Sequence, residues 1–131
     1  MRLTTCTLLD FYEGKYGPTI RIDVRKTEWL ELLKSMVLQM EEGALPELDL
    51  AGLGDTEKGE IGGLTLISGD TSALVRIPFQ GAEYDEFIWA VDAEARKEIL
   101  SAVDSLIAWG KEARHYLYEG EGVVIELAYK E

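Results

Sequence analysis

The residues best suited to nucleophilic chemistry are a single cysteine, Cys6, and a single histidine, His115. A catalytic thiol needs a base within hydrogen-bond reach, and His115 with Cys6 is the only Cys/His pair that the chain offers. Both residues lie in predicted strands at opposite ends of the chain, so a sheet could make them neighbours. However, cysteine is among the most buried residue types, and a lone histidine beside Tyr116 is typical of an ordinary sheet position. We therefore expect no catalytic pair, and no Gly-x-Ser-x-Gly motif offers another nucleophile.

Motifs for phosphate and metal binding are also missing. Residues 52–57 (Gly-Leu-Gly-Asp-Thr-Glu) lack the third glycine of a dinucleotide fingerprint, and the chain has no Gly-Lys-Ser/Thr element. One histidine and one cysteine cannot form a tetrahedral zinc site without carboxylates, and residues 55–59 lack the ligand positions of a calcium loop. We expect no cofactor and no metal. An enzyme that uses scattered carboxylates stays open, but 25 acids form too many pairs to single one out.

The acidic residues are informative through their distribution. The 131-residue chain carries 25 acidic and 13 basic side chains, a net charge of −12. Residues 41–94 hold thirteen acids and two bases, so this segment carries −11 and the rest of the chain −1. Nucleic acids and anionic membranes require clustered Lys and Arg, which argues against both as partners. The acids either only solvate the surface or attract a cationic partner, and Tyr84 beside Glu83 and Asp85 favours binding because aromatic residues anchor interfaces.

The first half of the chain predicts a hairpin and a helix. Residues 2–12 and 19–25 flank a segment rich in turn formers, and the second of these strands alternates cleanly. Thr27 is the expected N-cap of an amphipathic helix that Gly43 closes. Residues 45–53 are expected to form a short strand and a loop, followed by an exposed polar tip at 54–60.

The second half predicts three strands, a helix and a hairpin. Residues 61–68, 72–79 and 84–91 indicate a meander, in which Pro78 places its strand at an edge or ends it. Asp92 caps a helix that stops at Gly110. Two last strands, 114–118 and 123–129, form the second hairpin.

This order, ββ-α-βββ(β)-α-ββ, predicts an α+β fold in a single domain, residues 1–131. One antiparallel sheet of about six to seven strands, with two amphipathic helices packed on one face, satisfies the pattern. The start of the chain is too polar for a signal peptide, and no apolar run reaches the roughly 18 residues of a membrane helix. With one thiol, which fits a reducing compartment, we expect a cytoplasmic protein.

The charge pattern and the last third of the chain resemble the small acidic α+β immunity proteins of bacterial polymorphic and contact-dependent toxin systems. The resemblance lies in the acid-rich domain without catalytic motifs, in Phe87–Asp92 followed by the helix to Gly110, and in 115–117 leading into 123–127. It implies a stoichiometric inhibitor. Cognate toxins are often basic nucleases, and an immunity protein either plugs the active site or binds beside it.

We therefore expect a non-enzymatic protein whose acidic strands and loops dock on a cationic partner, which the resemblance identifies as a toxin domain. The expected contacts are Glu47, Asp49, Asp55, Glu57, Glu60, Glu83, Tyr84, Asp85 and Glu86. Neutralising Glu83, Asp85 and Glu86 together should slow association and flatten its salt dependence. The alternative is a homodimeric adaptor or structural domain whose sheet edge pairs with a second copy.

Overall fold

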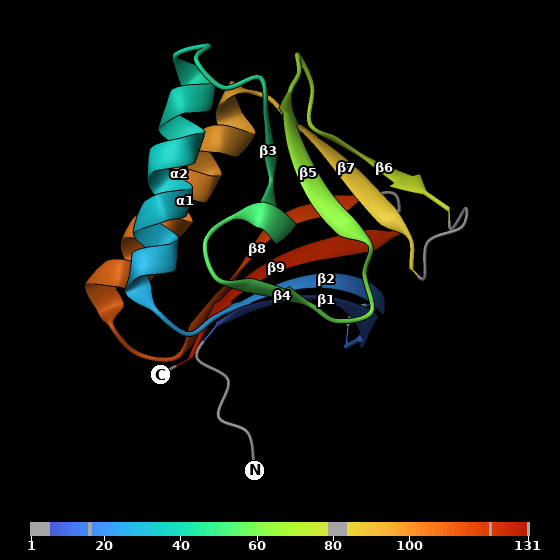
Figure 1. Ribbon diagram of the computed structural model, residues 1–131, viewed down its shortest axis with the longest axis horizontal. Coiled ribbons are helices and arrows are strands. Elements are labelled where there is room, and N and C mark those ends of the chain that lie inside the picture. The colour runs from blue at the N-terminus through green and yellow to red at the C-terminus, as the bar shows by residue number, and fades with distance from the viewer. Residues whose placement is uncertain (1–5, 16, 79–83, 121, 131) are drawn as a thin grey trace.

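The computed structural model describes residues 6–15, 17–78, 84–120 and 122–130. The fold is α+β with two helices, but the prediction of a single antiparallel sheet is wrong. The strands form two mixed sheets, a five-stranded sheet in the order β4-β1-β2-β9-β8 and a four-stranded sheet in the order β3-β5-β7-β6. Both helices and the four-stranded sheet lie on the same side of the five-stranded sheet (Figure 1).

The five-stranded sheet joins the two ends of the chain. The predicted hairpins are present as β1 (Thr7–Gly14) with β2 (Gly17–Val24) and β8 (Ala113–Gly120) with β9 (Val123–Tyr129). They pair with each other through the parallel strands β2 and β9. The segment predicted as an exposed tip instead contributes β4 (Thr56–Lys58), which pairs in parallel with β1 and supplies the edge of this sheet.

The four-stranded sheet is built from the middle of the chain. It contains β3 (Glu47–Asp49), β5 (Gly63–Ser68), β6 (Ala73–Ile77) and β7 (Glu86–Val91), and the 3-10 helix η1 (Leu50–Gly52) follows β3. The predicted meander is wrong, because β7 lies between β5 and β6 and pairs with β5 in parallel.

The burial of large side chains explains why β7, and not β6, pairs with β5 in the four-stranded sheet. Strand β7 sends Phe87 and Trp89 into the core, each 1% exposed, so burial favours a central position for it. Strand β6 is left at the edge and ends before Pro78, as the missing N–H donor of proline predicts.

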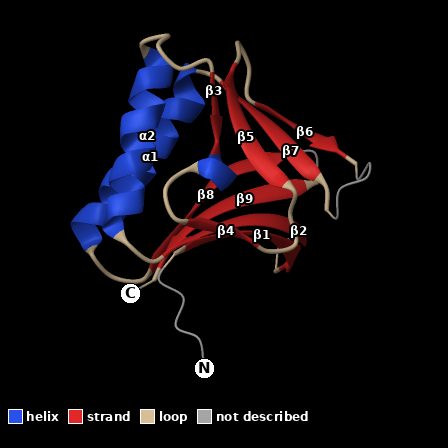
Figure 2. Cartoon of the chain, viewed as in Figure 1, coloured by secondary structure: helices blue, strands red, loops and turns tan. Residues whose placement is uncertain are grey.

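The two helices are close to their predicted positions. Helix α1 (Thr27–Glu41) has Lys26 at its N-cap without a side-chain hydrogen bond, so Thr27 is the first helical residue and not the cap. Helix α2 (Ala93–Trp109) begins after Asp92, whose carboxylate accepts from the Ala95 N–H at 2.8 Å. It ends at Gly110, which has a left-handed φ of 66°. The helices pack against each other (Figure 2). Within the part of the chain that the structure describes, neither is long and apolar enough to cross a membrane.

One cluster of buried side chains connects both sheets and both helices. Alternate strand residues fill this cluster, such as Ile20 and Ile22 of β2 and Leu64 and Leu66 of β5. Because successive side chains of a strand point to opposite faces, the intervening residues lie on the outer faces of the two sheets.

Candidate functional site

The outer face of the four-stranded sheet is apolar at its centre. Its outward apolar residues, which we call the apolar face, are Ile67, Ala73, Val75, Ile77, Ile88 and Ala90. Across the strands, Val75 pairs with Ile88, and Ala90 pairs with both Ala73 and Ile67. Val75 is 55% exposed and Ile77 38%. Adjacent apolar side chains left in contact with water are typical of a protein-binding surface.

Carboxylates border the apolar face on two sides. Glu47 and Asp49 of β3 point outward beside β5, where Glu47 pairs with Ile67. Glu86 begins β7 and pairs with Ile77 of β6. We call Glu47, Asp49 and Glu86 the acidic rim. The outward positions of these four strands carry no Lys or Arg in the residues that are described, so the rim has one sign of charge. An apolar centre with a charged border is the usual composition of a protein interface.

A hollow of about 340 Å³ opens near the Glu86 end of the same sheet. It lies between the two sheets and is lined by Phe11, Tyr12, Glu13, Glu60, Arg76, Tyr84 and Asp85. The structure thus brings together Glu60, Tyr84 and Asp85, three of the residues that the sequence predicts as partner contacts. We call this region the acidic hollow.

The guanidinium group of Arg76 lies in the acidic hollow and is a cation of the chain itself. Its Nε donates a hydrogen bond to Asp85 Oδ2 at 2.6 Å. The guanidinium carbon lies 5.1 Å from the centre of the Phe11 ring and 5.8 Å from that of Phe87. A carboxylate beside two aromatic rings is a favourable environment for a guanidinium or ammonium group. The chemistry of the hollow therefore suits cationic side chains.

Backbone contacts fix the chain around the acidic hollow. Asp10 Oδ1 accepts hydrogen bonds from the N–H groups of Glu60 at 2.6 Å and Phe11 at 2.9 Å. The Gly62 N–H donates to the Asp85 carbonyl at 2.7 Å. A Cβ on Gly62 would lie 2.6 Å from the carbonyl oxygen of Tyr84, so this close approach requires glycine. These contacts hold the segment around Glu60 against both sheets.

The remaining predicted contacts lie elsewhere. Asp55 directly precedes β4 and Glu57 lies within it, at the edge of the five-stranded sheet. Both carboxylates are close enough to Cys6 to affect the pKa of its thiol. Burial, with the charges of Glu57 and Asp55 and a hydrogen bond to Glu57, raises the pKa of Cys6 and disfavours the nucleophilic thiolate. Glu83 lies outside the described residues.

Cys6 and His115 are not neighbours. Cys6 directly precedes β1 and His115 lies on β8, and β2 and β9 separate these strands. Three interstrand spacings of about 4.8 Å place the strands roughly 14 Å apart. A Cys–His catalytic pair therefore cannot form in this fold.

Sequence reasoning missed the apolar face. A usable signal was present, because residues 63–68, 73–77 and 86–91 carry apolar side chains at both odd and even positions. Such two-sided strands are usually buried on both faces. Here the outer face of the sheet stays exposed, which leaves Val75 and Ile77 in contact with solvent.

Comparisons with known proteins give no relative for this chain. No protein-family model matches it, and no match was found among the curated proteins or the solved structures. Among the residues that the structure describes, no group of three or more His, Cys, Asp and Glu side chains could hold a metal ion. The two outer faces and the acidic hollow are therefore the basis for arguing function.

Proposed function

We propose that this chain is a non-enzymatic binding protein that docks a cationic protein on the apolar face and the acidic rim. In its cellular role it acts as the immunity protein of a bacterial toxin. The observation that carries the proposal is the outer face of the four-stranded sheet, where exposed apolar side chains such as Val75 are bordered by Glu47, Asp49 and Glu86.

The two parts of this surface have different physical roles. Burying the apolar face removes hydrocarbon from water, at about 25 cal/mol per Å², and supplies most of the affinity. The acidic rim and the −11 charge of residues 41–94 attract a cationic partner over longer distances and speed its association. A basic toxin domain, such as a nuclease, has the complementary charge.

A homodimer is the second candidate, because β6 is an edge strand with exposed Val75 and Ile77. Edge strands offer unpaired backbone groups to a second copy. A symmetric dimer through the whole face would, however, oppose the acidic rim with an identical rim, which costs energy. Sedimentation at low and high protein concentration separates the candidates, since a strong dimer gives twice 14.6 kDa with little salt dependence.

The experiment for the proposed function has two steps. The tagged chain is used to capture partners from a lysate of the source organism at low and high salt, and captured proteins are identified by mass spectrometry. The captured partner is then expressed in a bacterium with and without this chain. We expect one basic protein, held more weakly at high salt, that stops growth alone and is harmless when the chain is present. Capture of a harmless protein, or growth arrest that the chain does not relieve, would refute the immunity role.

A further inference from the structure

The outer face of the five-stranded sheet contains a second hollow, of about 170 Å³. It is lined by Arg21, Glu112, Ala113, Arg114, Ala128, Tyr129 and Lys130. Three cations and one carboxylate surround it, although the whole chain has a net charge of −12. We call it the cationic hollow. It lies on a different sheet from the apolar face, so the proposed function leaves it unexplained.

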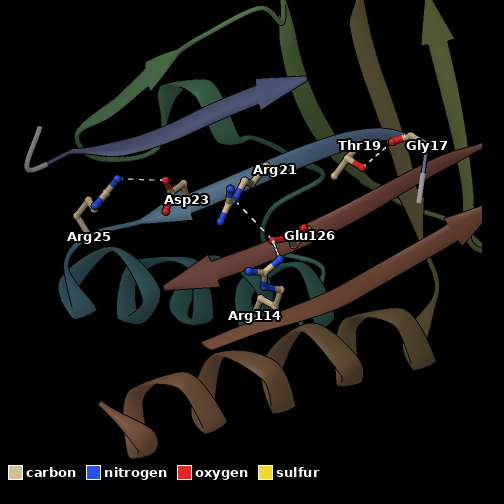
Figure 3. A network of polar contacts seen from close by, with 7 residues as sticks. All are labelled: Gly17, Thr19, Arg21, Asp23, Arg25, Arg114 and Glu126. Carbon is tan, nitrogen blue, oxygen red and sulfur yellow. Dashed lines mark hydrogen bonds and ion pairs between the residues drawn. The ribbon is translucent and has the colours of Figure 1, made fainter. Parts of the chain in front are cut away.

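The register of three strands creates the cationic hollow. On the outward side of β9, Ala128 pairs with Arg114 of β8, and Glu126 pairs with Arg21 of β2. The residues directly across from Ala128 are Arg114 on β8 and Asp23 on β2, and Arg21 lies two residues before Asp23 on the same face of β2. The small side chain of Ala128 therefore leaves space between Arg114 and, diagonally across β2, Arg21. Figure 3 shows both arginines directed toward β9.

Glu126 holds the two guanidinium groups without using up their donors. It is 3% exposed, and its Oε1 lies 3.6 Å from Arg21 Nε and 3.8 Å from Arg114 Nη1 (Figure 3). Both distances exceed hydrogen-bond length, and Arg21 Nε and Glu126 Oε1 are buried without a hydrogen-bond partner among the described residues. Each guanidinium has five N–H donors, so most of those on Arg21 stay available to a ligand.

Arg25, also on the five-stranded sheet side of the molecule, differs from Arg114 because its guanidinium donates a hydrogen bond to a carboxylate. Its Nη2 donates to Asp23 Oδ2 at 3.3 Å, and it does not line the cationic hollow. Arg114, by contrast, is 61% exposed at its side chain and borders the hollow. A hydrogen bond with Tyr116 and the charge of Glu126 raise the pKa of Arg114, so its positive charge is present at any physiological pH.

We propose that the cationic hollow binds an oxyanion, a carboxylate or phosphate group, between Arg21 and Arg114, with Lys130 at its border. The planar fork of a guanidinium matches two oxygens of either group. Glu126 and Glu112 offset two of the three positive charges, and Asp23, opposite Ala128, is paired with Arg25 at 3.3 Å. This balance leaves a net attraction for an anion, and Glu126 positions the two arginines.

Nuclear magnetic resonance titrations of the full chain test this site. Sodium phosphate and sodium acetate are added separately, with sodium chloride keeping the ionic strength constant, and the Nε–Hε signals of Arg21 and Arg114 are followed. We expect a saturable shift with one or both anions. The anion with the lower Kd identifies the phosphate or the carboxylate as the preferred group.

Three variants with the same charge change make the test specific. Arg114→Gln removes an exposed side chain of the site and should weaken binding about tenfold, and Lys130→Gln should weaken it about threefold. Lys97→Gln, on the exposed surface of α2, should leave Kd unchanged within about twofold. Circular dichroism verifies that each variant is folded. Shifts that do not saturate, or equal Kd values for Arg114→Gln and Lys97→Gln, would overturn the oxyanion site.

Discussion

The outer faces of the two sheets differ although both sheets enclose the same core. On the five-stranded sheet the outward residues Glu126 and Asp23 are 3% and 6% exposed, and arginines lie beside both. On the four-stranded sheet the outward Val75 is 55% exposed, and the charged residues at the outward positions of its described strands, Glu47, Asp49 and Glu86, are negative. The polar residues are thus sheltered and the apolar ones exposed, the reverse of the usual distribution.

This contrast is the reason why we propose the four-stranded sheet as the docking face. On the five-stranded sheet the outward carboxylates Glu126 and Asp23 lie beside arginines, and the ligand that we propose for the cationic hollow is only a small anion. The apolar face and the acidic rim have no such compensation from the outward residues of their own strands. A cationic protein with an apolar centre to its binding surface would cover the apolar face and supply positive charges opposite the acidic rim.

The largest expected effect comes from placing a charge in the apolar face. Val75→Lys should weaken binding of the captured partner about 100-fold, or by about 2.7 kcal/mol, because a charge would be buried without a counterion. Leu38→Lys makes the same change at a 39% exposed residue of α1 and should leave the affinity unaltered. Calorimetric titration measures both values, and equal losses would place the docking surface elsewhere.

A pair of glycine substitutions tests the backbone around the acidic hollow. Gly62→Ala should lower the free energy of unfolding by about 1–3 kcal/mol, because its Cβ would meet the carbonyl of Tyr84 at 2.6 Å. At Gly63 the nearest atom to a Cβ is Glu86 Oε1 at 3.8 Å, so Gly63→Ala should be neutral or slightly stabilising. Urea unfolding measures both variants. A stable Gly62→Ala protein would show that the segment is not held as tightly as described.

On the five-stranded sheet, Glu126→Gln should cost about 1–2 kcal/mol of unfolding free energy. The change leaves two guanidinium groups without their shared countercharge, although their partial exposure limits the penalty. Asp104→Asn breaks the exposed ion pair with Lys34 and should cost less than about 1 kcal/mol. Thermal or urea unfolding measures both variants. Equal losses of unfolding free energy for Glu126→Gln and Asp104→Asn would show that the buried ion pairs of Glu126 stabilise the fold no more than an exposed ion pair does.

The smallest expected effect is on the association rate. Changing Glu47 and Glu86 to Gln and Asp49 to Asn should slow association with the partner several-fold at low salt and little at high salt. The same number of charges is removed in a control that changes three exposed residues of the two helices, Glu28, Glu31 and Glu98, to Gln. Stopped-flow rates should fall more for the acidic rim than for the control. Equal association rates for the two triple variants would show that the net charge of the chain, and not the position of the acidic rim, determines the rate.

Local patterns in the sequence predict the individual helices and strands well, but they predict poorly which strands pair with each other in a sheet. Alternation and turn formers identify both hairpins, and Asp92 and Gly110 define α2 correctly. The parallel pairs β2–β9 and β5–β7 join segments that are separated in sequence, and nothing within either segment specifies that pairing. That is why one antiparallel sheet was predicted where two mixed sheets form.

The candidate site was predicted in part for the same reason. Charge alone identifies the acidic segment, but only the fold sorts its residues. It places Glu47, Asp49 and Glu86 on the acidic rim, gathers Glu60, Tyr84 and Asp85 in the acidic hollow, and moves Asp55 and Glu57 to the other sheet. Their contact with a partner stays a prediction.

The central claim is that the partner covers the apolar face, and amide hydrogen exchange with and without the captured partner tests it most directly. We expect slower exchange in β5, β6 and β7, most of all at the edge strand β6, with no change in β2 and β9. Protection confined to β2, β8 and β9, or to the helices, would contradict the assignment of the apolar face as the docking surface.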